Sequence, residues 1–307
     1  MTLLKQILGV IDLLEAPEIS KGGLERFFGK HDSVELETEE IAGDKGKTLL
    51  VRIHVRGAGQ GPTLGVVGRL GGVSARPGKA GLVSDADGAI VALSVALKLA
   101  EMASRGDKLK GDVIVVTHIA TKAVVRRLGG VAMMESPVDI FGLLKKEADP
   151  RMDAVVSIDA TKANRVVNHN GIAITPVVKD GWILRIPDEI LDIYVRVTGD
   201  RPVIVPLTMQ DVTPFTTRVR HINSIVQPWI YTEAPVLGVA TTARETVPGS
   251  ATGATNPFIL DMAARFVLEV AKEYTAGNLR FYDEDEWREL IATHGDLGSM
   301  LRKGAPP

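Results

Sequence analysis

The chain of 307 residues contains no cysteine, which excludes disulfides, thiolate metal sites and cysteine nucleophiles. It also lacks a strong charge of either sign: its formal net charge is −2, so nucleic acid and anionic membranes are not expected partners. No run of about 18 apolar residues is present to span a bilayer. The N-terminus has no signal-peptide pattern. We therefore predict a cytoplasmic protein whose partners are small molecules or peptides.

What the sequence does contain is a regular alternation of short apolar runs and amphipathic stretches. The runs at 113–117 and 154–158 are β-rich and continuously apolar, which is typical of buried, mostly parallel strands. This rhythm predicts an α/β three-layer sandwich with a mostly parallel mixed sheet. One domain is expected over 1–279, with an acidic appendage over 280–307. We expect further strands at 47–56, 63–68, 202–206 and 235–241, a hairpin turn at 57–62, and helices at 3–15, 22–28, 89–103, 138–148, 188–197 and 257–274.

Several familiar motifs can be rejected. Gly46-Lys47-Thr48 imitates the end of a phosphate-binding loop, but Ile41 stands where the first glycine is needed. The chain also lacks a Gly-x-Ser-x-Gly nucleophile elbow and a His-Glu-x-x-His zinc motif. Nucleotide binding and serine hydrolysis are therefore not indicated.

Polar residues at predicted strand ends remain as candidates. Asp85 and Asp87 lie directly before a helical stretch, His118 ends the strand at 113–117, and Asp159 ends the run at 154–158, with Lys162 behind it. Each has a structural alternative: the first two can cap a helix, His118 can be a core residue, and Asp159 can open a turn. Ligands bind where parallel strands end. The carboxylates of Asp85 and Asp159 and the imidazole of His118 would therefore together suit zinc or manganese.

The order of these elements resembles that of the co-catalytic zinc aminopeptidases over roughly residues 45–275. In that family a strand ends in His-x-Asp, and an Asp-Asp-x-x-Gly segment opens a helix. Later strands end in Glu-Glu and in a ligand aspartate, and a late loop supplies a histidine. The resemblance implies that Asp85, three residues before Gly88, is the metal-bridging aspartate. It also implies that Asp159 is the later ligand.

Other positions of the pattern differ. Arg69 stands at the first histidine, and Gly71 at the acid that follows it. The Glu-Glu pair falls at His118 and Ile119, and no histidine occurs near 244–248. The whole chain, including the segments 171–175 and 244–257, is also similar to a bacterial group, domain-of-unknown-function family 1177.

Two functions follow from these resemblances, and the mild charge and the 280–300 segment also permit a third class, a structural or regulatory subunit that works through its surface. The first is a metal-dependent hydrolase of a small amide or peptide, using a divalent zinc or manganese ion. In it Asp85, His118 and Asp159 are metal ligands, Glu245 is the candidate base, and Arg69 anchors the substrate. The alternative is a catalytically inactive aminopeptidase-like protein that binds an amino-acid-like or peptide ligand. The resemblance also implies a homo-oligomer.

Overall fold

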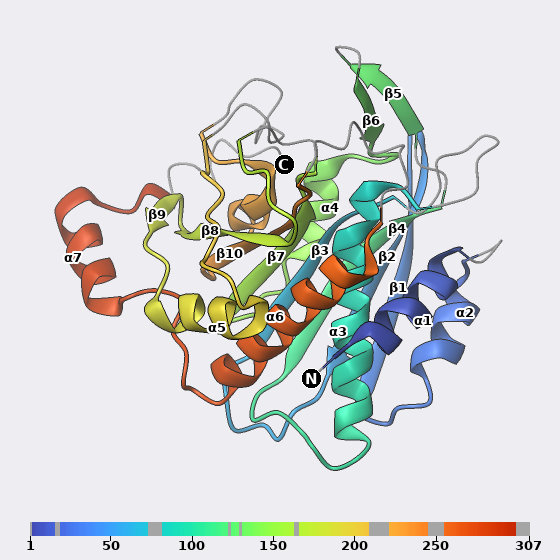
Figure 1. Ribbon diagram of the computed structural model, residues 1–307, viewed down its shortest axis with the longest axis horizontal. Helices are drawn as coiled ribbons and strands as arrows, with labels where there is room; N and C mark the ends of the chain where they lie inside the picture. The colour runs from blue at the N-terminus through green and yellow to red at the C-terminus, as the bar shows by residue number, and fades with distance from the viewer. Residues whose placement is uncertain are drawn as a thin grey trace.

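The computed structural model describes residues 2–15, 19–72, 82–121, 124–128, 131–162, 166–208, 221–244 and 255–298 (Figure 1). Its main sheet is mixed, with the strands in the order β1 (Val34–Gly43), β2 (Gly46–Val55), β4 (Val113–Ala120), β3 (Leu64–Gly72), β7 (Ala154–Ala160), β10 (Val236–Thr241), β8 (Ile172–Lys179) and β9 (Trp182–Leu184). The four central strands, β4, β3, β7 and β10, run parallel to one another. The outer pairs are antiparallel.

Helices cover both faces of this sheet, which confirms the predicted three-layer α/β sandwich (Figure 1). Successive side chains along each strand point to opposite faces of the sheet, so the sheet separates two hydrophobic cores. Val66 faces the larger core and Val67 the smaller one. The larger core lies under α1 (Leu4–Glu15), α2 (Lys21–Phe28), α3 (Asp87–Ala103), α5 (Asp188–Thr198) and α6 (Pro257–Thr275). The smaller core lies under α4 (Ile140–Glu147) and the 3-10 helix η2 (Ser224–Ile230).

The two long helices follow directly from their sequences. α3 is apolar on almost every side, because it is packed between the sheet, α1 and α6. α6 begins as predicted: the Asn256 side chain accepts hydrogen bonds from the backbone N–H groups of Phe258 and Ile259, and Pro257 occupies the first turn. None of the described helices combines the length and the apolar sequence needed to cross a bilayer.

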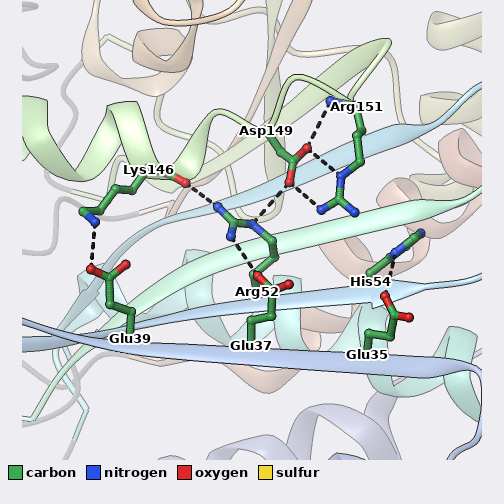
Figure 2. A network of polar contacts seen from close by, with 8 residues as sticks. All are labelled: Glu35, Glu37, Glu39, Arg52, His54, Lys146, Asp149 and Arg151. Carbon is green, nitrogen blue, oxygen red and sulfur yellow. Dashed lines mark hydrogen bonds and ion pairs between the residues drawn. The ribbon is translucent and has the colours of Figure 1, made fainter.

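Two predicted features are wrong. The segment 57–62 does not join a hairpin, because β4 lies between β2 and β3 in the sheet. The segment 202–206 is not a strand: Ile204 makes only an isolated bridge to Ile174. The acidic strand β1 was not predicted. Its glutamates face basic residues of β2 and α4, which offsets its low strand propensity (Figure 2).

Two smaller parts complete the described chain. The strands β5 (Val124–Leu128) and β6 (Val131–Glu135) form a separate antiparallel pair. Near the C-terminus, α7 (Glu284–His294) has no buried residue. It is attached near β8 and β9 by Lys179, whose Nζ lies 5.5 Å from the ring centre of Tyr282 and 5.1 Å from that of Trp287. The division into a domain over 1–279 and an appendage over 280–307 stays a prediction.

Candidate functional site

The candidate site lies where the four parallel strands end and α3 begins. A short 3-10 turn, η1 (Ser84–Ala86), leads into α3. Glycines allow this close approach: a Cβ on Gly88 would lie 2.6 Å from the carbonyl oxygen of Arg69 and 2.5 Å from that of Ile158. No side chain fits there without displacing backbone. Gly88 therefore holds the start of α3, with Asp85 and Asp87, against the ends of β3 and β7.

Three predicted residues form a row across neighbouring strands. Gly68 of β3 is in register with Thr117 of β4 and Ile158 of β7. The next residue on each strand follows at the strand ends, where the register between β3 and β4 shifts, and all three are buried on the face covered by α4 and η2. These residues are Arg69, His118 and Asp159.

A carboxylate from α4 joins two members of this row. Glu147 Oε2 accepts a hydrogen bond from an Arg69 guanidinium nitrogen at 3.1 Å, and Glu147 Oε1 lies 2.8 Å from His118 Nδ1. The other terminal nitrogen of Arg69 donates to Gln227 Oε1 on η2 at 2.8 Å. Burial by itself would raise the pKa of Glu147, but the His118 hydrogen bond and the Arg69 charge hold it below its usual range. Glu147 is therefore an ionised acceptor, and Nδ1 of His118 carries a proton.

Two nitrogens of this network can form a further hydrogen bond. His118 Nε2 and Arg69 Nε are buried and have no hydrogen-bond partner among the described residues. A substrate carboxylate could reach Arg69 in a bidentate way only by displacing Glu147 or Gln227. The role of Arg69 as a substrate anchor therefore stays a prediction that requires a rearrangement.

A second network surrounds Asp87, the first residue of α3. Its Oδ2 lies 2.5 Å from Lys162 Nζ and accepts a 2.7 Å hydrogen bond from Thr241 Oγ1 at the end of β10. Burial raises the pKa of Asp87, and Lys162 partly offsets that effect. Its Oδ1 is buried without a hydrogen-bond partner among the described residues. Helix capping does not explain this aspartate, because the N-cap of α3 is Ala86 and no side chain caps the helix.

Asp85 and Asp159 are the other two aspartates where the four parallel strands end. Burial, then the nearby charges of Asp159 and Asp87, raise the pKa of Asp85 to about 7. Burial also raises the pKa of Asp159 to about 6, although Arg69 and the Ala160 N–H lower it. Asp159 is buried, whereas Asp85 is partly exposed. Of the two, Asp85 is thus the carboxylate that a ligand can reach from solvent.

The donor set of the described residues does not fit a resident divalent metal ion. No group of three or more histidine, aspartate or glutamate side chains in the described ranges is arranged to hold one. Lys162 lies on Asp87, and Nδ1 of His118 faces Glu147. The assignment of Asp85, His118 and Asp159 as metal ligands therefore stays a prediction. Glu245, the predicted base, lies outside the described residues.

Sequence reasoning missed Glu147 and Gln227 because neither is at a strand end. For Glu147 a signal was present. It follows Leu143 and Leu144 at helical spacing, and all three are buried on one face of α4. A charged residue at a core position of an amphipathic helix indicates a buried ionic partner.

Residues 39–304 match the model of a family described as a protein of unknown function, DUF1177. The chain belongs to this family. No curated protein sequence matches it. The family description assigns no activity to this DUF1177 protein.

Solved structures show its fold. The LapA aminopeptidase of Legionella pneumophila is similar with a TM-score of 0.52 at 10% identity, covering 89% of this chain and 71% of that one. A glutaminyl cyclase from an Acidobacteriales bacterium also has a TM-score of 0.52 at 10% identity, covering 90% and 94%. The bottromycin maturation enzyme BotP has a TM-score of 0.50 at 16% identity, covering 86% and 69%. The DUF1177 chain therefore has an aminopeptidase-like fold.

Proposed function

We propose that this protein binds a small amino-acid-like or peptide ligand at the carboxyl edge of β3, β4, β7 and β10, without a resident metal ion. The names of the similar structures support the ligand class, since they include an aminopeptidase and a maturation enzyme. The edge itself supports a ligand with a cationic amino group, because carboxylates gather there. Ligands of open α/β sheets bind at this edge.

The observation that carries the proposal is the pair Asp85 and Asp159. Two carboxyl groups whose pKa values are raised to about 7 and about 6 are held where ionisation is costly. A ligand ammonium group placed against Asp85 would favour the ionised form of both groups. The binding free energy would therefore come mainly from pairing carboxylates that burial makes costly to ionise, and in part from offsetting the charge repulsion on Asp85.

The test is a thermal-shift and calorimetric comparison of amino acids and short peptides with their N-acetylated counterparts. Ligands with a free amino group should raise the melting temperature of the wild type, and acetylation should abolish that rise. Asp85→Asn should remove the effect. Asp32→Asn is the matched control, because Asp32 is exposed beside the start of β1, at the opposite edge of the sheet. Equal binding of acetylated ligands would contradict the proposal.

The second candidate is a metal-dependent hydrolase of a small amide or peptide, with a remodelled metal site. The same carboxylate pair favours it, since a divalent cation would also relieve Asp85 and Asp159. One similar structure is BotP in complex with Mn, with a TM-score of 0.50 at 14% identity. In this candidate Asp85, Asp159 and His118 hold zinc or manganese, and Glu245 is the base.

Elemental analysis of protein purified without chelator decides between the two. About one equivalent of zinc or manganese in the wild type, lost in an Asp85→Ala/Asp159→Ala double variant, would favour the hydrolase and justify an amide-substrate screen. Absence of bound metal after incubation with zinc and manganese would favour the binding protein. Cytoplasmic location and a homo-oligomer are further proposals, which cell fractionation and light scattering would test.

A further inference from the structure

Lys162 is an unusual residue for a protein interior. Its side chain is only 3% exposed, and lysine is almost never this deeply buried without a charged partner. Its position explains the burial: it follows β7 by two residues and reaches Asp87 at the start of α3, with 2.5 Å between Nζ and Oδ2. Lys162 therefore places a fixed positive charge at the carboxyl ends of the parallel strands, where the acidic side chains lie.

This cation serves more than one carboxylate. Asp87 is fully buried and also bonded by Thr241, so its position is fixed on both sides. The charge of Lys162 lowers the pKa of Asp85 as well as that of Asp87. Asp159 lies three residues before the lysine, near Arg69, whose charge lowers the pKa of that aspartate. The lysine ammonium therefore has the electrostatic surroundings that a metal ion would have among these aspartates.

We propose that the Lys162 ammonium supplies the cation of this carboxylate cluster in the role of a metal ion, and that its presence prevents a divalent ion from binding there. The inference rests on the proposed function for the location of the site, but not on the identity of the ligand. Its chemical consequence is definite. An ammonium group neutralises carboxylates and donates hydrogen bonds, but it cannot coordinate a water molecule and lower the pKa of that water as zinc does.

A charge-removing variant tests this inference. Lys162→Met keeps most of the side-chain volume and removes the charge, leaving Asp85 and Asp87 without the cation that lowers their pKa values. Titration calorimetry with zinc chloride and manganese chloride should detect no binding to the wild type and about one equivalent bound to Lys162→Met. Zinc should also raise the melting temperature of Lys162→Met by roughly 5 °C and leave that of the wild type unchanged.

Two further variants keep the test decisive. Lys162→Arg retains the positive charge and should bind no metal. Lys162→Met/Asp87→Asn contains no unpaired Asp87 charge, should fold even if the single variant needs zinc to fold, and should bind zinc at least tenfold more weakly than Lys162→Met. Zinc or manganese binding to the wild type that Lys162→Met does not strengthen would overturn the inference. So would a folded Lys162→Met protein that binds neither metal. Amino-acid binding is measured in a separate experiment. Its absence would contradict the proposed function and would leave the metal titrations of the Lys162 variants as an independent result.

Discussion

Two carboxylates placed two residues apart, Glu147 and Asp149, have opposite surroundings. Glu147 ends α4 and lies fully buried between Arg69 and His118. Asp149 follows on the outer side, where Arg151 and Arg52 contact it, and Arg52 also pairs with Glu37 of β1 (Figure 2). The Arg151 side chain is half exposed, so water can replace it as a partner of Asp149.

The pKa of both carboxyl groups is lowered, but by different balances. For Asp149 the side-chain hydrogen bond from Arg151 is the largest influence, and burial, the second largest, opposes it. For Glu147 burial is the largest influence and opposes ionisation, and it is overcome by His118 and Arg69 together. The inner network, formed by Glu147, Arg69 and His118, thus depends on each of its members. The outer network, formed by Asp149, Arg151, Arg52 and the pairs of β1 beside them, shares its charge with solvent.

The largest effect is expected for Glu147→Gln. This change leaves the buried Arg69 guanidinium without its counter-charge, so the free energy of unfolding should fall by about 3–5 kcal/mol. Urea denaturation followed by circular dichroism would measure it. The triple replacement Arg69→Met/His118→Leu/Glu147→Leu removes the charges together and should restore much of that loss. A loss below about 1 kcal/mol in Glu147→Gln would mean that water reaches the network.

The next effect concerns pH and Asp159→Asn. The pKa of Asp159 is raised from 3.8 to about 6, so the native state holds this proton more tightly than the unfolded chain does. Its contribution to stability is present below pH 4 and is lost as the pH rises through about 6. Asp159→Asn should remove this slope and exceed the wild type in stability at pH 8 by on the order of 2 kcal/mol. Urea unfolding at pH 4, 6 and 8 measures it, and parallel curves for the two proteins would contradict it.

These two residues also show how far the sequence could predict the site. Asp159 was predicted because it ends an apolar run, and the sharing of one edge by parallel strands is a general rule. Glu147 was missed because its partners, Arg69 and His118, are 78 and 29 residues away in the chain. Only the packing of α4 on β3 and β4 brings them together. Strand ends can be inferred from local pattern, whereas the choice of ionic partners depends on how the layers pack.

The same distinction applies to the fold. Helices α3 and α6 were predicted nearly in full, since their apolar patterns are local and Asn256 with Pro257 marks the start of α6. The strand β1 was missed because its alternating glutamates are poor strand formers until β2 and α4 supply basic partners. The false hairpin at 57–62 has a related cause: turn residues indicate a change of direction but not which strand becomes the neighbour.

A smaller loss is expected at the outer network. Asp149→Asn removes a carboxylate that accepts two hydrogen bonds from the Arg151 side chain, at 2.9 and 2.7 Å, and one from its backbone N–H at 3.0 Å. The asparagine can keep only part of this set, and water can satisfy the rest. The free energy of unfolding should fall by about 1–2 kcal/mol, as measured by urea denaturation. A loss as large as that of Glu147→Gln would remove the contrast between the two networks.

The smallest effect is expected for Glu39→Gln. Glu39 pairs with Lys146 at 2.7 Å, but both side chains are about half exposed, at 52% and 45%. Water can hydrate either group, and ordering two long side chains costs entropy, so the change should lower the free energy of unfolding by no more than about 0.5 kcal/mol. Raising the salt concentration to about 1 M should remove even that difference, because screening weakens exposed pairs more than buried ones. Urea denaturation at low and high salt, with Glu147→Gln measured beside it, checks both points. If the loss in Glu39→Gln exceeded about 1 kcal/mol and did not change with salt, exposure would not be what separates the outer network from the inner one.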